Sequence, residues 1–212
     1  MSDLLRDRIA AGLGKAALKL GIATDAYRPS SATTPLALRN RFLRLPVAFH
    51  VGRGFDTPAT HGTPLWQAML DSAYTKPGDY LAQGAETWFI AAQPRLLPVL
   101  CVKTNRTVSF TRAVAPDRVG PSSYAGMQRA MLRPLLTDWP ASMLASGTAR
   151  NAGTPLPADL PAMQWSVLLP AFPAVVLHAG DRMADDIGRA GIVISADLTD
   201  LGWRLSVREA SA

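Results

Sequence analysis

Two segments of this 212-residue chain resemble copies of one β module. Each begins with a tryptophan, Trp66 or Trp165, and each contains one of the only two Gly-Asp pairs in the chain. In both segments an apolar run rich in β-branched residues follows the Gly-Asp pair, and an alternating strand pattern ends the segment. A Gly-Asp pair between apolar runs is typical of a tight turn between antiparallel strands. The pattern therefore favours a small β unit that is used twice.

The offset between the two segments drifts along the chain. It is 99 residues at the tryptophans, 102 at the Gly-Asp pairs, 104 at Ile90 and Ile194, and 97 at Ser109 and Ser206. If the segments are true copies, this drift reflects insertions and deletions in loops. Two unrelated β-meanders would also carry Gly-Asp turns between apolar runs, so both interpretations stay open at this point.

Proline and glycine separate the modules from the rest of the chain. The 17 Pro and 16 Gly are typical of a turn-rich β protein with extended segments. We expect a mainly β fold with two small β-barrel or sandwich-like modules, an N-terminal helix and long Pro-rich arms. The expected division is residues 1–64 for the helix and a basic arm, 65–112 for the first module, 113–164 for an extended arm, and 165–212 for the second module.

Residues 3–20 form the one helix that the pattern predicts. Leu5, Ile9 and Leu13 lie on one apolar stripe at helical spacing, and Gly21 is placed to end the helix. Two internal glycines weaken the helix, so it requires docking for stability. The stripe can pack on the helix's own domain or on a neighbouring subunit.

The net charge of +6 lies in the first quarter of the chain. Residues 1–53 hold nine Lys and Arg against three Asp, whereas the remaining residues hold thirteen of each sign. A basic arm can meet an acidic partner, nucleic acid or a membrane surface. Arg39, Arg41 and Arg44 alternate with apolar residues and are our candidates for contact with an acidic neighbour or packaged DNA, although a solvated face is the commoner case. In the second arm, Trp139 and Leu144 are candidates for anchoring it on a surface.

The sequence contains no pattern that predicts catalysis or metal binding. Cys101 is the single cysteine and lies in an apolar run, while His50, His61 and His178 have no metal-ligand spacing. Asp181, Asp185 and Asp186 lack the spacing of a calcium loop and are better explained as turn residues. No phosphate-binding loop and no Gly-x-Ser-x-Gly pattern is present. We therefore expect neither an enzyme nor a bound cofactor.

No contact with a membrane is expected from the pattern of apolar residues. The first twenty residues carry six charged side chains, which argues against a secretory signal peptide. The longest apolar stretches, at 96–102 and 167–177, are too short to form a transmembrane helix.

The second module carries a resemblance to a known group of proteins. It resembles the small β-barrel pattern of tailed-bacteriophage head–tail joining and connector proteins, at residues 168–170, 175–177, 180–183, 186–189 and 192–196. In that pattern an apolar strand leads to a Gly-Asp turn, a tight hairpin and a strand of Val and Ile. Three further segments are similar to parts of uncharacterised proteins in phage and prophage virion clusters, namely residues 3–8, 77–81 and 199–204.

The resemblance implies a virion structural protein that forms a ring or collar in the neck, tail or baseplate. Its partners would be copies of itself and other phage neck, tail or baseplate proteins, in a virion assembled in the host cytoplasm. The chain is about twice the size of simple connectors and has a basic helical N-terminus, so a ring at the tail–baseplate junction fits as well as a neck ring. The resemblance transfers no catalytic residue. The alternative is a nucleic-acid-binding module that uses the basic first quarter, although contact with packaged DNA is not expected.

Overall fold

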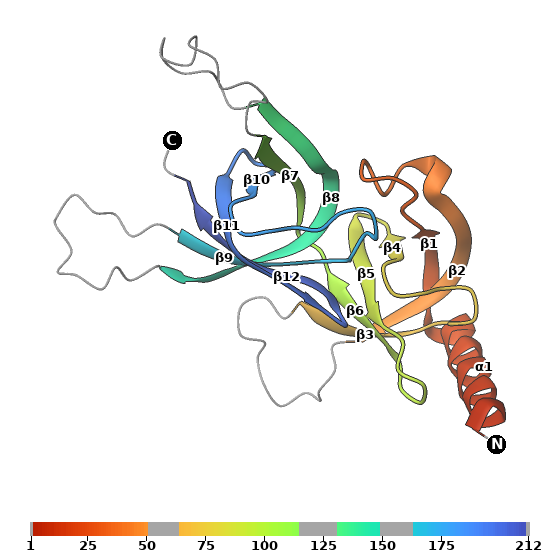
Figure 1. Ribbon diagram of the computed structural model, residues 1–212. Coiled ribbons are helices and arrows are strands. Elements are labelled where there is room, and N and C mark those ends of the chain that lie inside the picture. The colour runs from red at the N-terminus through yellow and green to blue at the C-terminus, as the bar shows by residue number, and fades with distance from the viewer. Residues whose placement is uncertain (1, 51–63, 115–130, 149–162, 211–212) are drawn as a thin grey trace, which may run out of the picture.

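Two rings of antiparallel strands make up most of the protein (Figure 1). The computed structural model describes residues 2–50, 64–114, 131–148 and 163–210. Barrel 1 consists of β1 (Ile22–Tyr27), β2 (Arg41–His50), β3 (Leu65–Met69), β4 (Tyr80–Gln83), β5 (Glu86–Ala92) and β6 (Val99–Lys103). Barrel 2 consists of β7 (Arg106–Val114), β8 (Met131–Thr148), β9 (Met163–Leu169), β10 (Arg182–Asp185), β11 (Ala190–Thr199) and β12 (Gly202–Glu209). The expected mainly β fold with two modules and an N-terminal helix is confirmed.

The two barrels have the same connectivity. Around barrel 1 the strand order is β1-β2-β3-β6-β5-β4, and around barrel 2 it is β7-β8-β9-β12-β11-β10. Each strand of barrel 1 therefore has a counterpart six strands later in the chain. Both rings are closed, which leaves neither barrel with an unpaired edge strand.

Irregularities in the strand pairing also recur at equivalent places. The pairing of β5 with β6 shifts between Ile90 and Ala92, and the pairing of β11 with β12 shifts between Val193 and Ser195. A second shared shift follows Ala26 in β1 and Phe110 in β7. A β-bulge inserts a residue at a defined point of a ladder, so its repetition at two positions supports duplication over two unrelated meanders.

The barrels divide the chain differently from the expected ranges. Strands β1 and β2 come from the segment expected to be a helix and an arm. Strand β7 of barrel 2 lies almost entirely in the range expected to be the first module, and β8 lies in the expected middle arm. Pro46 and Pro140 lie inside β2 and β8 at equivalent positions, opposite Ala23 and Thr107. Proline removes a hydrogen-bond donor but is compatible with extended backbone. The proline content therefore does not distinguish strands from extended arms in these segments. The other parts of the two expected arms, at 51–63, 115–130 and 149–162, lie outside the described residues.

Two parts of the sequence alignment are also wrong. The counterpart of Ile90 is Val193 and not Ile194, since each precedes the same bulge. Ser109 was matched with Ser206, but Ser109 lies in β7, whose counterpart is β1, and Ser206 lies in β12, whose counterpart is β6. The offsets at the tryptophans and at the Gly-Asp pairs do match equivalent strands and turns. The repeat unit is therefore a whole six-stranded barrel, which begins well before the tryptophan.

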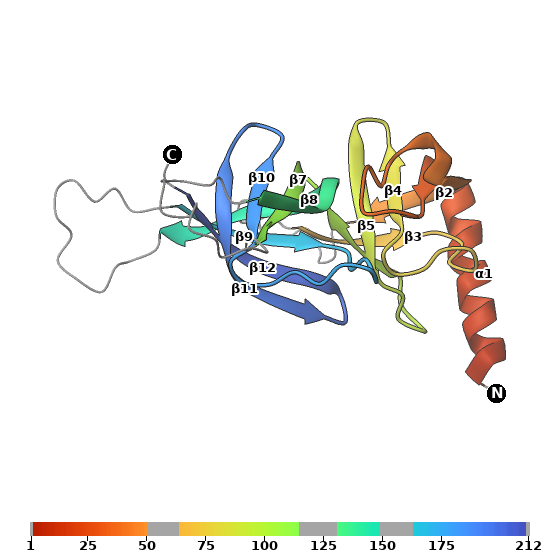
Figure 2. The ribbon, with the colours of Figure 1, turned by 45° about the horizontal axis from the view of Figure 1, so that its top comes forward.

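The helix α1 (Ser2–Leu20) packs against β2 and β3 of barrel 1. Ala17 on its C-terminal half is fully buried, and the helix ends at Gly21, whose N–H donates to the Ala17 carbonyl at 2.8 Å. A side chain at Gly21 would lie 2.8 Å from the backbone of Val47, which explains the glycine. Figure 2 shows the N-terminal half of α1 extending beyond the barrel. Among the described residues, no helix combines the length and apolarity needed to cross a membrane.

Large apolar side chains fill barrel 1. Leu81, Trp88 and Ile90 point inward and are almost fully buried. Phe49 stacks on Trp88 with 3.8 Å between ring centroids. These side chains form a packed apolar core inside barrel 1, as expected for a small barrel.

The two barrels pack against each other through a buried aromatic cluster. Tyr80 and Phe89 lie on the outer face of barrel 1 and belong to the same apolar cluster as the core of barrel 2. The Tyr80 hydroxyl donates to the Pro140 carbonyl at 2.9 Å, and its ring meets Trp139 edge to face at 6.1 Å. Burial of an aromatic side chain contributes about 2 kcal/mol, and the hydroxyl bond fixes its orientation. The barrels are thus joined by a continuous core.

Candidate functional site

The Gly-Asp pair of barrel 1 forms a tight turn with a buried aspartate. Gly78 has a φ of +93°, a conformation that favours glycine, and the Asp79 side chain is 1% exposed. Arg28 donates to the Asp79 carboxylate from Nε at 2.8 Å and from Nη2 at 2.7 Å. The backbone N–H of Lys76 donates to the same carboxylate at 2.9 Å, and Arg28 Nη2 also donates to the Tyr74 carbonyl at 3.1 Å. One carboxylate therefore ties the end of β1 to the loop before β4.

Barrel 2 repeats this arrangement bond for bond. Gly180 has the same φ of +93°. Asp181 accepts bonds from Arg112 Nε at 2.7 Å and Nη2 at 2.9 Å, and from the backbone N–H of His178 at 2.8 Å. Arg112 Nη2 also donates to the Val176 carbonyl at 2.8 Å. The hydrogen bond to the aspartate raises the pKa of the arginine in both barrels, so each arginine stays charged.

Each of these two turns stabilises its own barrel, and neither has the features of a reactive site. Each buried aspartate is bound by a bidentate arginine and a backbone N–H, which uses most of its acceptor capacity. A carboxylate held in this way does not act as a general base. The aspartates were expected to be turn residues, but Arg28 and Arg112 were missed. A buried acid requires a cation, and nothing in the sequence identifies which of the 22 Lys and Arg supplies it.

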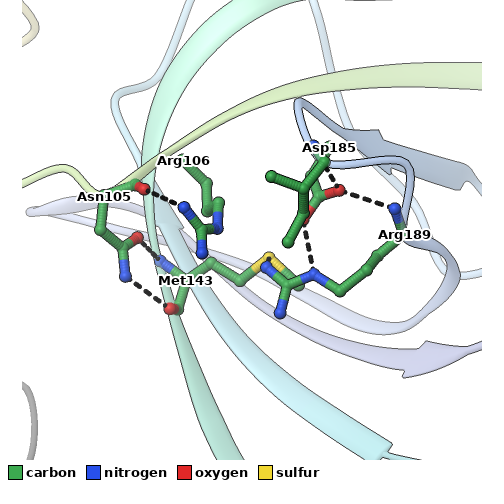
Figure 3. A network of polar contacts seen from close by, with 6 residues as sticks. Asn105, Arg106, Met143, Asp185 and Arg189 are labelled. Carbon is green, nitrogen blue, oxygen red and sulfur yellow. Dashed lines mark hydrogen bonds and ion pairs between the residues drawn. The ribbon is translucent and has the colours of Figure 1, made fainter.

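A polar network closes one end of barrel 2 (Figure 3). Asp185 begins the turn between β10 and β11 and accepts a bond from Arg189 Nε at 2.7 Å and from the Arg189 backbone N–H at 2.8 Å. The Arg189 guanidinium reaches Met143 Sδ at 3.5 Å and lies 5.2 Å from the Trp165 ring centroid. Asn105 joins the network by exchanging two bonds with the Met143 backbone. The network links β8 and β9 to the β10–β11 turn.

The Asp185–Arg189 pair predicts a pH dependence of stability. Burial by itself raises the pKa of Asp185, but the bonds from Arg189 outweigh it and leave the pKa below its ordinary value of 3.8. A depressed carboxyl pKa stabilises the folded state above the ordinary pKa, and this stability is lost as the pH falls toward the folded-state pKa. We expect Asp185→Asn to lower the free energy of unfolding by about 1–2 kcal/mol at pH 7 and by clearly less at pH 3. Urea unfolding at both pH values tests this, with the exposed Asp186→Asn as control. A difference that is constant with pH would contradict it.

Side chains that can bind a metal ion do not cluster in the part of the chain that the structure describes. No group of three or more His, Cys, Asp or Glu there could hold a metal ion. Cys101 is buried inside barrel 1, and burial raises the pKa of its thiol well above the ordinary value. His50 and His178 are exposed, and His61 lies outside the described residues. That the chain is not an enzyme stays a prediction.

A polar groove of about 440 Å³ runs over the outside of barrel 2. Its lining includes four serines, Ser146, Ser166, Ser195 and Ser206. Serine needs an adjacent base to act as a nucleophile, and the described lining residues contain no histidine or lysine. The charged residues of the lining are Asp197 and Arg204.

The predicted contact residues of helix α1 lie N-terminal to the residue that packs most completely on barrel 1. Leu5 is 51% exposed, and Ile9 and Leu13 are partly buried. The side chain that packs most completely is Ala17, one turn further along. Docking of the predicted stripe on a neighbouring subunit stays a prediction.

The other predicted contact residues lie in several places and do not form one site. Arg39 is exposed before β2, whereas Arg41 and Arg44 lie 3.5 Å and 3.8 Å from the Asp25 carboxylate. Trp139 is fully buried where the barrels meet, so it anchors a strand of barrel 2 and not an extended arm. Leu144 is half-buried on β8.

Two exposed apolar surfaces lie on different barrels, one beside α1 and one on β10 and β11; Figure 2 shows these elements well apart. The α1–β2 groove is an open depression of about 360 Å³ between the helix and barrel 1. It is lined by Ala11, Gly14, Lys15, Leu18, Leu43, Arg44, Leu45, Pro46, Asp71 and Tyr74. The β10–β11 face is the outer side of those strands in barrel 2, where Ile192 and Ile194 are exposed.

The chemistry that the described residues offer is packing and ion pairing between segments. Comparison with known proteins found no matching family model, no matching curated protein and no matching solved structure.

Proposed function

We propose that the chain is a structural subunit of a tailed-phage particle that forms a ring or collar between neighbouring layers of the neck, tail or baseplate. The assignment to a phage rests on the resemblance of residues 168–170, 175–177, 180–183, 186–189 and 192–196 to head–tail joining and connector proteins. Its partners in this proposal are copies of itself and adjoining virion proteins. The proposal assigns the chain no catalytic step and no cofactor.

The observation that carries the proposal is the junction between the two barrels. Tyr80, Phe89 and Trp139 form one buried cluster with the core of barrel 2, so the two barrels form a stiff unit. A subunit that joins layers must transmit force between them without hinge motion. Exposed apolar surfaces on both barrels of such a unit suit contacts with neighbours, because large exposed apolar patches mark interaction sites.

The test is the composition of purified particles. We expect quantitative mass spectrometry of purified virions to find the chain at a fixed, low copy number relative to the major capsid protein. Electron microscopy with an antibody against the chain should label one level of the particle. Particles that form and infect normally without the chain would overturn the proposal.

The three exposed arginines before and within β2 favour nucleic-acid binding as a second candidate function. Arg39, Arg41 and Arg44 lie close together in sequence on one side of barrel 1, but Asp25 partly neutralises two of them. We expect only weak, salt-sensitive DNA binding with a Kd of about 10⁻⁵ M at physiological salt.

A matched pair of triple variants decides between the two functions. One variant replaces Arg39, Arg41 and Arg44 with alanine, and the control replaces the exposed Arg182, Arg204 and Arg208 of barrel 2. We expect both to weaken binding in fluorescence anisotropy by a similar factor. Nanomolar binding that only the first variant abolishes would favour the nucleic-acid function instead.

A further inference from the structure

Because the two barrels share one fold, the packing of barrel 1 on barrel 2 within the chain shows how one such barrel can contact another. Barrel 1 contributes the outer face of β4 and β5, where Tyr80 and Phe89 lie. Barrel 2 contributes one of its ends, where Trp139 and Pro140 of β8 meet Tyr80. The contact is heterologous because two different surfaces of the same fold meet.

The counterpart of the contributing face in barrel 2 is exposed. Tyr80 follows Asp79 and pairs with Phe89, just as Arg182 follows Asp181 and pairs with Ile192. Ile192 therefore holds the position of Phe89, and Ile194 holds that of Ala91 at the shared bulge. Phe89 is 1% exposed, whereas Ile192 is 40% and Ile194 is 45% exposed. Among the described residues, the β10–β11 face is thus the exposed equivalent of a surface that is buried in barrel 1.

The counterpart of the receiving end in barrel 1 is the α1–β2 groove. Leu45 and Pro46 hold the positions of Trp139 and Pro140, because they pair with equivalent residues of β1 and β7. Both residues line the α1–β2 groove, which helix α1 covers only in part. Leu18 and Tyr74 on its walls are 71% and 66% exposed. The receiving end of barrel 1 is therefore occupied by a helix that leaves apolar surface uncovered.

We propose that the β10–β11 face of one copy docks in the α1–β2 groove of a second copy. The inference deepens the proposed ring function by naming the two surfaces that meet. It extends the established contact between the barrels, since both halves of that contact are present again, at least partly exposed, on the two barrels. A heterologous contact of this kind repeats from copy to copy and closes into a ring when the rotation permits.

Both surfaces carry charged side chains of both signs. The α1–β2 groove carries Lys15, Arg44 and Asp71. Beside the two isoleucines, Arg182 and Arg208 hold the positions of Tyr80 and Val102. Asp71 can pair with an arginine, and the exposed Asp186 on the β10–β11 turn can pair with Lys15 or Arg44. The proposed contact between copies is therefore more polar than the contact within the chain.

Two complementary variants of the full chain test the proposal. The groove variant is Leu18→Arg, and the face variant is Ile192→Arg with Ile194→Arg; Leu38→Arg, an exposed position outside both surfaces, is the control. Because all these side chains are exposed, we expect each variant to keep the circular dichroism and melting temperature of the wild type. Sedimentation velocity should show concentration-dependent assembly of the wild type and the control, and self-association at least about 10-fold weaker in both other variants.

Mixing the variants provides the decisive result. The groove variant retains an intact face and the face variant retains an intact groove, so an equimolar mixture should form a one-to-one dimer that neither forms alone. A wild type that stays monomeric at about 100 µM, variants that assemble as the wild type does, or a mixture that forms no dimer would each overturn the proposal. If one of these results were obtained but the chain were found in virions, the proposed structural function would still hold. Absence of the chain from virions would overturn that function, whether or not the chain self-associates.

Discussion

Replacing Trp139 with alanine is expected to lower the free energy of unfolding by about 4 kcal/mol. Trp139 is fully buried and packs against Tyr80 and Phe172, with centroid distances of 6.1 Å and 5.6 Å. Its indole N–H donates to the Ala32 carbonyl at 2.8 Å. The substitution leaves a cavity where the barrels meet, and neighbouring residues can fill it only partly. Urea unfolding followed by circular dichroism measures the loss.

Two further variants separate packing from hydrogen bonding at this position. Trp139→Phe keeps an aromatic ring but loses the N–H, and we expect it to cost about 1–2 kcal/mol. The Ala32 carbonyl still accepts a bond from the Thr137 N–H in that variant, which limits the cost. Leu198→Ala, at an exposed position on β11, should change stability by less than about 0.5 kcal/mol. A Trp139→Ala loss below about 1.5 kcal/mol would show that the junction does not depend on this side chain.

The sequence predicted the helix and the Gly-Asp turns, which depend on residues that are close together in the chain. The helix over residues 3–20 follows from its spacing of apolar residues and from Gly21, and α1 ends at Leu20. The Gly-Asp pairs predicted turns, and both glycines adopt a positive φ. A turn and a helix end depend on a few neighbouring residues, so the sequence contains most of the information that fixes them.

Features that depend on distant residues could not be predicted in the same way. The prolines of β2 and β8 made these strands resemble arms, because the pairing that holds them extended comes from partners far along the chain. Trp139 was recognised as an anchor, but its partners Tyr80 and Phe172 are 59 and 33 residues away in the sequence. The duplication was detected at Trp66 and Trp165 but misplaced at its start, since β1 and β7 share little sequence.

The buried aspartates give the second large effect. Removing the Asp181 carboxylate by substitution with alanine should lower the free energy of unfolding by about 3 kcal/mol. The loss arises because Arg112 and the His178 N–H lose their shared acceptor. Arg112 is 35% exposed and regains some hydration, which keeps the loss below that of a fully buried pair. Asp79→Ala should cost a similar amount, because the same bonds hold barrel 1.

Matched variants distinguish this bidentate pairing from general charge attraction. Arg112→Lys keeps the positive charge but offers no planar pair of donors, so we expect it to lose about 1–2 kcal/mol. The exposed Asp200→Ala serves as control and should change stability by less than about 0.5 kcal/mol. If Arg112→Lys were neutral, charge alone would account for the pair. If Asp79→Ala and Asp181→Ala differed by more than about 2 kcal/mol, the two turns would share a geometry without sharing its energetic role, and the barrels would have diverged in what stabilises them.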